Sequence, residues 1–224
     1  MEGYLFEKNM KELKIGEIIV KLNTVVNPEN LFDQLIQRGE KHKDVIDENI
    51  PYWAELWPAS VGISNYIVEN SLSFEGKSVL EIGCGLGLAG ICAKYLGAEV
   101  LMTDYLEEAI EMACENWELN FDDAPNVIQF DWRKLDLKQQ FDIVIGSDIL
   151  YDQSNFPFLL KLFSEIIQED GMLILSDPKR SHARNFIKEL ESLGFVVEII
   201  QKDVILEERN HCIEIFVCRR SIEI

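Results

Sequence analysis

Residues 79–90 read Val79-Leu80-Glu81-Ile82-Gly83-Cys84-Gly85-Leu86-Gly87-Leu88-Ala89-Gly90, a short apolar run that passes directly into a glycine-rich segment. The apolar run has the composition of a buried strand, and the glycines permit a tight turn into a following helix. This run is the first of five short strand-like runs that are separated by helical patterns. They comprise residues 78–82, 99–103, 126–130, 141–146 and 172–176. This alternation predicts an α/β fold with a mostly parallel, doubly wound sheet.

The spacing of apolar side chains predicts the helices between these strands. Residues 105–120 carry apolar side chains at i, i+3, i+4 and i+7, with acidic residues between them. A second helix is expected after Ser154, ending where Gly171 interrupts the pattern, and a third over residues 181–193. These helices would pack on the sheet.

The two ends of the chain depart from this alternation. Near the C-terminus, the apolar runs 195–200 and 212–218 are joined by charged residues with no helix between them, which predicts a hairpin and an antiparallel last strand. Residues 1–50 carry the patterns of a small hairpin and a helix. We therefore expect an N-terminal extension over 1–50 and one main domain over 51–224.

Composition excludes several classes of protein. The chain has 224 residues, with 21 Lys+Arg against 40 Asp+Glu and a net charge of −19, and its 47% hydrophobic content is enough to bury a core. So acidic a surface repels phosphate, which argues against nucleic-acid or anionic-membrane partners. The five cysteines lack disulfide-framework or zinc-ligand spacing, and the sequence pattern predicts neither a leader nor a membrane-spanning stretch. We expect a soluble cytoplasmic protein without a metal.

The glycine-rich turn fits two cofactor classes. From Gly85 onward it satisfies G-x-G-x-x-G, and Asp104 lies near the spacing of about 20 residues typical of dinucleotide folds. If the turn instead starts at Gly83, Glu81 is the strand residue that points at the ligand. A carboxylate there repels a pyrophosphate but favours the ammonium and sulfonium charges of S-adenosylmethionine. The turn therefore favours S-adenosylmethionine over a nicotinamide dinucleotide.

Other polar residues follow the predicted strands. Asp104 ends the second strand, where it is placed to accept hydrogen bonds from ribose hydroxyls; the alternative is a helix N-cap. Asp131 and Trp132 close the third strand and suit an adenine, which needs a stacking face and an edge acceptor. The alternative for Trp132 is a surface-capping role.

The fourth strand ends in Gly146-Ser147-Asp148-Ile149-Leu150-Tyr151-Asp152, at the edge where open α/β sheets bind ligands. Asp148 and Tyr151 could face the same cleft, one binding a cation and the other offering an aromatic face and a hydroxyl. The alternative is a plain strand-to-helix turn in which Asp152 or Ser154 caps the next helix.

Three motifs together resemble the class I, seven-strand S-adenosylmethionine-dependent methyltransferases, and more narrowly methyltransferase family sixteen, which contains many protein-lysine methyltransferases. They are Trp57-Pro58-Ala59-Ser60, Glu81-Ile82-Gly83-Cys84-Gly85 and Asp148-x-x-Tyr151, and the similarity covers residues 50–219. The resemblance implies a Rossmann-like sheet of order 3-2-1-4-5-7-6 with the seventh strand antiparallel. It also implies that Asp148 and Tyr151 line the channel for the target nitrogen.

We expect the cofactor to be contacted by Trp57, Glu81, Gly83, Cys84, Gly85, Asp104, Tyr105, Asp131, Trp132 and Ser147. The function that this reading predicts is methyl transfer to a lysine side chain of a protein substrate, with the lysine in a basic patch. Three alternatives stay open: a small-molecule amine methyltransferase with a compact closed pocket, an NAD-dependent oxidoreductase, and a silent module that binds S-adenosylhomocysteine.

Overall fold

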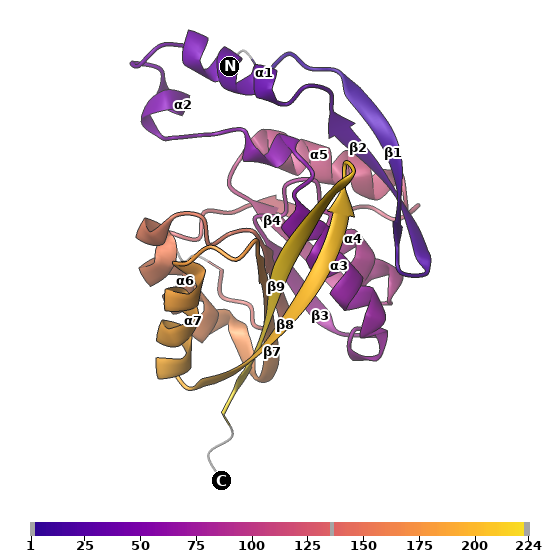
Figure 1. Ribbon diagram of the computed structural model, residues 1–224, viewed down its shortest axis with the longest axis vertical. Coiled ribbons are helices and arrows are strands. Elements are labelled where there is room, and N and C mark those ends of the chain that lie inside the picture. Colours follow the sequence, from indigo (N-terminus) through magenta and orange to yellow (C-terminus); the bar gives the residue numbers. More distant parts are fainter. Residues whose placement is uncertain (1–2, 135–136, 222–224) are drawn as a thin grey trace.

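The computed structural model describes residues 3–134 and 137–221 and is built around one seven-stranded sheet (Figure 1). Its strands are β3 (Ser78–Ile82), β4 (Glu99–Asp104), β5 (Val127–Gln129), β6 (Phe141–Ser147), β7 (Ile167–Asp177), β8 (Phe195–Leu206) and β9 (Arg209–Arg220). Their order is β5-β4-β3-β6-β7-β9-β8, and β9 runs antiparallel to both of its neighbours. The predicted α/β class, strand order and antiparallel seventh strand are confirmed.

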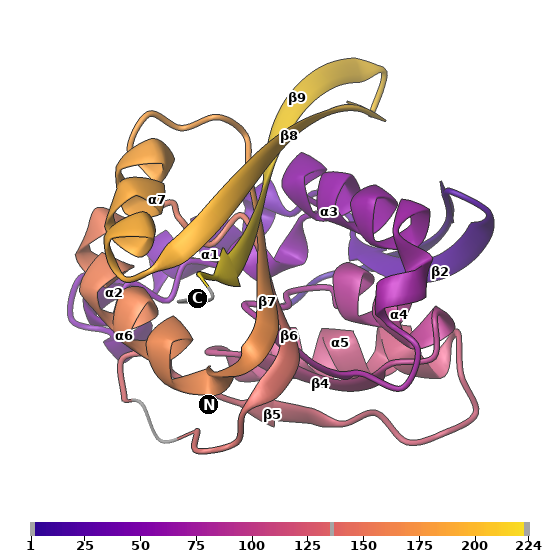
Figure 2. The same cartoon turned by 90° about the horizontal axis from the view of Figure 1, so that it is seen from below.

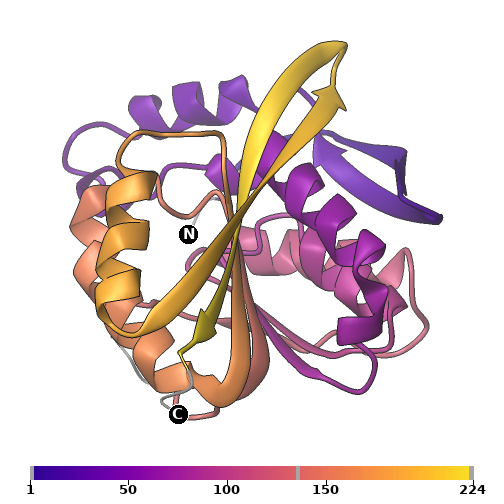
Figure 3. The ribbon, with the colours of Figure 1, turned by 60° about the horizontal axis from the view of Figure 1, so that its bottom comes forward.

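Helices cover both faces of the sheet (Figures 2 and 3). One face carries α3 (Pro58–Glu69), α4 (Leu88–Tyr95) and α5 (Glu107–Glu118), and the other carries α6 (Phe156–Ile166) and α7 (Ala183–Ser192). The alternation of side chains along a strand separates the two cores. In β3, Val79 belongs to the core on the α3 side, whereas Leu80 and Ile82 belong to the core on the α6 side.

The N-terminal residues form the expected hairpin and helix. They comprise β1 (Lys8–Ile15), β2 (Ile18–Val25), α1 (Glu29–Gln37) and the short α2 (Lys43–Ile46). The hairpin's buried side chains, such as Val20 and Leu22, join the core on the α3 side. The Asn23 amide donates to Asn116 Oδ1 at 2.7 Å, and Asn116 Nδ2 donates to the Leu86 carbonyl at 2.9 Å. The hairpin is therefore tied to the glycine-rich turn through one buried asparagine.

The predicted end of the helix after Ser154 is wrong. A single 3-10 turn (Gln153–Asn155) leads into α6, which ends at Ile166, and β7 begins at the next residue. Pairing of β7 with β6 shifts register early in the strand, and a Cβ at Gly171 would lie 2.9 Å from the Gln168 carbonyl oxygen. Gly171 therefore lies at an irregularity within strand β7, where a side chain would clash with the backbone. Glycine is typical both of such irregularities and of helix ends, so the sequence alone did not distinguish them.

The C-terminal hairpin is longer than the sequence pattern indicated. Strands β8 and β9 pair over their whole length and meet at a two-residue turn, Glu207-Glu208, in which φ is 50° and 63°. After Ile200, the strand β8 continues through Gln201, Lys202 and Asp203, and these polar residues hid its extent from a search for apolar runs. The end of the hairpin extends past the rest of the sheet (Figure 3), where Lys202 pairs with Glu69 of α3.

Two further 3-10 turns complete the structure, Tyr52–Ala54 and Ser71–Ser73. Across residues 3–134 and 137–221, no helix has the length and apolar character needed to cross a membrane.

Candidate active site

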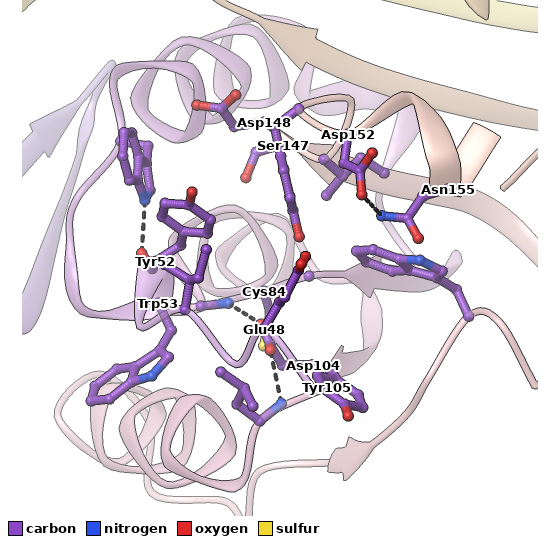
Figure 4. Close-up of a pocket in the computed structure, with 18 of the residues that line it drawn as sticks. Glu48, Tyr52, Trp53, Cys84, Asp104, Tyr105, Ser147, Asp148, Asp152 and Asn155 are labelled. Atoms are coloured by element: carbon purple, nitrogen blue, oxygen red, sulfur yellow. Dashed lines mark hydrogen bonds between the residues drawn. The ribbon is translucent and has the colours of Figure 1, made fainter. Parts of the chain in front are cut away.

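A cavity of about 930 Å³ lies at the carboxyl ends of β3, β4 and β6 (Figure 4). This is the edge at which open α/β sheets bind their ligands. The cavity brings together eleven of the twelve site residues expected from the sequence, namely Trp57, Gly83, Cys84, Gly85, Asp104, Tyr105, Asp131, Trp132, Ser147, Asp148 and Tyr151. The remaining one, Glu81, does not line it.

The glycine-rich turn starts at Gly83, as one of the two readings proposed. Gly83, Gly85 and Gly87 have φ of 62°, 52° and 78°, in the left-handed region that side chains disfavour. A Cβ at Gly83 would lie 2.9 Å from Ile149 Cγ2. The turn therefore needs glycine both for its backbone and for its close approach to the segment after β6.

Asp104 fixes this turn from the end of the neighbouring strand. Its Oδ2 accepts the Gly85 amide hydrogen bond at 2.9 Å and its Oδ1 accepts that of Leu106 at 3.2 Å. Burial raises the pKa of Asp104 although these hydrogen bonds favour its ionised form. Leu106 is itself the N-cap residue of α5 and makes no side-chain cap bond, so Asp104 shapes the turn before the helix rather than capping it.

Glu81 lies beneath the turn. It is fully buried on the α3 side of the sheet, the side that Val79 faces, and one carboxylate oxygen accepts the Gly90 amide of α4 at 2.9 Å. Its other oxygen, Oε1, is buried and has no hydrogen-bond partner. Burial raises the pKa of Glu81 to about 8. In the structure Glu81 therefore lies beneath the cavity lining and does not point into the cavity, and its raised pKa favours the protonated form at neutral pH.

Arg133 lies on the side of the cavity that follows β5, where it fixes the position of Asp131. It donates two hydrogen bonds to Asp131, at 2.8 and 3.1 Å, and its guanidinium lies 4.8 Å from the centre of the Tyr105 ring. Burial tends to raise the pKa of Asp131, but these hydrogen bonds hold it below its ordinary value. Trp132 is half-buried beside this pair and lines the cavity.

Asp148 is held in a constrained position by Arg180. Its φ of 58° is unusual for a residue with a side chain, and its amide donates to the Ser176 carbonyl at 2.9 Å. The carboxylate pairs with Arg180, which also bonds Asp177 at 2.9 Å. Burial raises the pKa of Asp148, and Arg180 partly offsets this. The sequence interpretation missed Arg180, although it follows β7, the strand next to β6.

Aromatic side chains line the same cavity. Tyr151 packs against Tyr52 with ring centres 5.5 Å apart, and Tyr52 packs against Trp57 at 6.0 Å and Phe32 at 6.0 Å. Trp57 Nε1 donates to the Tyr52 carbonyl at 2.8 Å. Burial raises the pKa of Tyr151 to about 12, so its hydroxyl stays neutral near pH 7.

The charge of the cavity is mainly negative. Its two cationic residues, Arg133 and Arg180, are outnumbered by seven acids: Asp47, Glu48, Glu55, Asp104, Asp131, Asp148 and Asp152. Glu48 and Tyr52 belong to residues 47–57, a segment that the sequence interpretation connected to the site only through Trp57. The lining therefore favours a positively charged group in contact with aromatic rings.

Comparisons with known proteins identify the family. The model of the lysine methyltransferase family matches residues 47–193. The zebrafish (Danio rerio) protein N-lysine methyltransferase METTL21A is 33% identical over 154 residues, which cover 65% of this chain and 70% of that protein. A histidine protein methyltransferase 1 homolog of Dictyostelium discoideum is 38% identical over 128 residues, covering 54% of this chain but only 41% of its own length. This chain belongs to the lysine methyltransferase family.

The fold agrees with that of solved methyltransferases. The crystal structure of magnesium protoporphyrin IX methyltransferase from Synechocystis, which contains bound S-adenosylmethionine, superposes with a TM-score of 0.55 and 22% sequence identity, over 84% of this chain and 97% of that one. The seven-stranded architecture is thus that of the class I methyltransferases.

The residues present fit S-adenosylmethionine better than a dinucleotide. The buried Glu81 Oε1 is an acceptor without a partner beneath the glycine-rich turn, and a positive charge in the cavity above it would favour the ionised carboxylate. Asp104 lines the cavity beside the glycine-rich turn, where it would accept hydrogen bonds from ribose hydroxyls, and the mainly acidic lining is unfavourable for a pyrophosphate. The donor set therefore suits a cofactor that carries positive charge and no phosphate.

Proposed function

We propose that this chain is an S-adenosylmethionine-dependent N-methyltransferase that methylates a lysine side chain of a protein substrate. The observation that carries the proposal is the cavity itself, in which a glycine-rich turn and an acid-rich aromatic lining meet at the carboxyl edge of the sheet. Membership of the lysine methyltransferase family supports the same activity.

The cofactor would occupy the side of the cavity formed by the glycine-rich turn. When bound, S-adenosylmethionine supplies a methyl group on a positively charged sulfur. Gly83 and Gly85 would bring the backbone close to it, and Asp104 would accept hydrogen bonds from the ribose hydroxyls. Trp132 and Asp131 would hold the adenine between a stacking face and a polar edge. Trp57, Cys84, Tyr105 and Ser147 complete the proposed contacts, with Glu81 acting from beneath the turn.

The target nitrogen would be positioned by Asp148 and Tyr151. A lysine attacks only as the neutral amine, and an unpaired carboxylate would stabilise the ammonium instead. The ion pair with Arg180 reduces the negative charge that Asp148 presents, so Asp148 would stabilise the ammonium less than an unpaired carboxylate does and would orient the amine, whose proton would pass to water or to Asp148. The neutral Tyr151 would shape the channel. Most of the acceleration would come from alignment of the nitrogen with the methyl group.

The net charge and the cysteines support the kind of partner and the cellular compartment that we propose. A net charge of −19 supports a substrate lysine in a basic patch and argues against nucleic-acid or anionic-membrane partners. The five cysteines are all free, which suits a reducing compartment such as the cytoplasm.

The test is incubation with radiolabelled S-adenosylmethionine and heat-treated lysate, followed by separation of protein from small molecules. Label in a discrete protein band that yields methyl-lysine on hydrolysis would support the proposal, whereas methyl-histidine would move the target to the residue named in the Dictyostelium relative. Label confined to small molecules would overturn it. Asp148→Ala is the control: it should bind S-adenosylhomocysteine normally and transfer no methyl group, and normal turnover would remove Asp148 from the mechanism.

A further inference from the structure

Two acids that line the cavity share an unusual backbone. Glu48 has φ of 53° and Asp148 has φ of 58°, in the left-handed region that non-glycine residues rarely adopt. Such conformations persist where the surrounding structure fixes them, and they concentrate at functional sites. The two residues come from different parts of the fold, since Asp148 follows β6 and Glu48 follows α2 in the N-terminal extension.

The two carboxylates differ in whether a nearby cation balances their negative charge. The Asp148 side chain is 10% exposed and is paired with Arg180. Glu48 is exposed, and no hydrogen bond or ion pair engages its carboxylate within residues 3–134 and 137–221. Figure 4 shows the Glu48 side chain turned into the cavity. Of these two carboxylates, that of Glu48 carries the uncompensated negative charge; among the described residues, Asp47 and Glu55 of the same lining have no ion pair either.

The backbone around Glu48 is fixed by a polar network. The Asn49 amide donates to the Asp44 carbonyl at 2.8 Å and Asn49 Nδ2 donates to Asp44 Oδ1 at 3.1 Å. Asp44 is in turn paired with Arg38. The Ile50 amide donates to the Glu48 carbonyl at 2.7 Å. This network holds Glu48 on the cavity without using its side chain.

We infer that Glu48 binds the ammonium of the target side chain as it enters the cavity and so selects a positively charged lysine over a neutral acceptor. The inference rests on the proposed function. Tyr52, four residues further on and also on the cavity lining, adds an aromatic face of the kind that attracts an alkylammonium. Glu48 would hold the charged amine first, and the amine would lose its proton later, beside the compensated Asp148.

The experiment uses the full chain and the protein band labelled in heat-treated lysate. Initial rates at increasing lysate protein give an apparent KM for that band, for wild type, Glu48→Gln and Glu48→Asp. The control is Glu40→Gln, which removes the same charge from an exposed residue of the same extension that does not line the cavity. Binding of S-adenosylhomocysteine, measured by calorimetry, reports on folding and on the cofactor side.

We expect Glu48→Gln to raise the apparent KM about tenfold, as loss of one charge-assisted hydrogen bond would. Its affinity for S-adenosylhomocysteine should equal that of wild type. Glu48→Asp keeps the negative charge, so its apparent KM should stay close to that of wild type. An apparent KM equal to that of Glu40→Gln would overturn the role of Glu48 and leave the proposed function standing. A wild-type protein that labels no protein band would overturn both.

Discussion

The glycine-rich turn and residues 47–57 line the same cavity but are built differently. The turn connects β3 to α4 within the sheet, and three left-handed glycines and Asp104 fix its shape. Residues 47–57 lie outside the sheet and are mostly irregular, with one short 3-10 turn. A Cβ at Gly85 would lie 3.6 Å from Trp53 Cα, so the two regions are in contact. Under the proposed function, the turn would bind the cofactor together with Trp57, and Glu48 and Tyr52 of the other region would meet the acceptor.

This difference separates what a mutation should do on each side of the cavity. Changes in the turn should alter cofactor affinity, changes at Glu48 and Tyr52 should alter acceptor affinity, and changes at Asp148 should alter the rate alone. A variant on one side that changed both cofactor affinity and acceptor affinity would show that the two sides do not act independently.

The largest effect is expected for Asp148→Asn. Asparagine tolerates the left-handed backbone but cannot accept a proton as a carboxylate does, so the rate of methyl transfer should fall about 100-fold or more. Affinity for S-adenosylhomocysteine should be unchanged in calorimetry. Arg180→Gln should retain that affinity too, and because the pKa of Asp148 then rises further, the acidic limb of its pH–rate profile should move to higher pH. An unmoved limb would show that Asp148 does not titrate in the reaction.

Gly83→Ala should weaken cofactor binding. The new Cβ would lie 2.9 Å from Ile149 Cγ2 at a φ of 62°, so the turn must shift, and we expect a loss of about 2 kcal/mol, or about 30-fold, in S-adenosylhomocysteine affinity. Gly39→Ala is a matched control in the N-terminal extension, with φ of 81° and nothing within 4 Å of its Cβ. It carries a similar backbone cost and should leave the affinity unchanged. Equal losses in both variants would mean that strain alone, and not the shape of the turn, is responsible.

Glu81 should make the stability of the free protein depend on pH. Its pKa is about 8 in the folded protein against an ordinary value of 4.5, so between these values the folded form holds a proton that the unfolded form has lost. The stabilisation is complete below the lower value and is lost as pH rises to the upper one. Relative to Glu81→Gln, wild type should lose about 1 kcal/mol per pH unit over this range. Parallel denaturation midpoints for the two proteins from pH 5 to 8 would contradict the raised pKa.

The smallest effect is expected for Tyr52→Ala. The variant removes the ring contacts with Tyr151, Trp57 and Phe32. The contact with Tyr151 is the one beside the proposed acceptor channel and is worth about 1 kcal/mol, so the apparent KM for the protein substrate should rise about fivefold, with cofactor affinity unchanged. Tyr95→Ala is the control, because Tyr95 is as exposed as Tyr52, at 39% against 38%, but packs on Phe121 away from the cavity. A matching change in both variants would assign the effect to general destabilisation.

Sequence patterns predicted those parts of the molecule that regular backbone determines. The start of the turn at Gly83 and the position of Asp104 at the end of β4 follow from periodicity and from where each strand ends, whereas the strand order followed from the family resemblance. Arg180 was within reach of the same reasoning, since it follows β7 and neighbouring parallel strands end at one edge. Alternation along β3 also places Glu81 on the same face as Val79, beneath α4.

Glu48 and Tyr52 were beyond such reasoning. They sit in irregular chain, with no period to assign a direction to their side chains, and their positions depend on long-range contacts such as that between Tyr52 and Tyr151. The length of the β8–β9 hairpin was also hidden, because the polar residues Gln201, Lys202 and Asp203 interrupt the apolar pattern of β8 before the turn.

The turn of that hairpin offers a route to a more heat-resistant protein. Glu207 and Glu208 both occupy left-handed conformations, each of which costs a residue with a side chain about 1 kcal/mol. Asn-Gly is the pair that a two-residue turn of this kind prefers. Replacing Glu207-Glu208 by Asn-Gly would give up only the exposed contact of Glu207 with Lys11, at 3.7 Å, and would remove a negative charge that raises the pKa of Glu55. The long ladder of β8 and β9 already tolerates an unfavourable turn, which leaves unused stability that an engineer could recover far from the glycine-rich turn and Asp148.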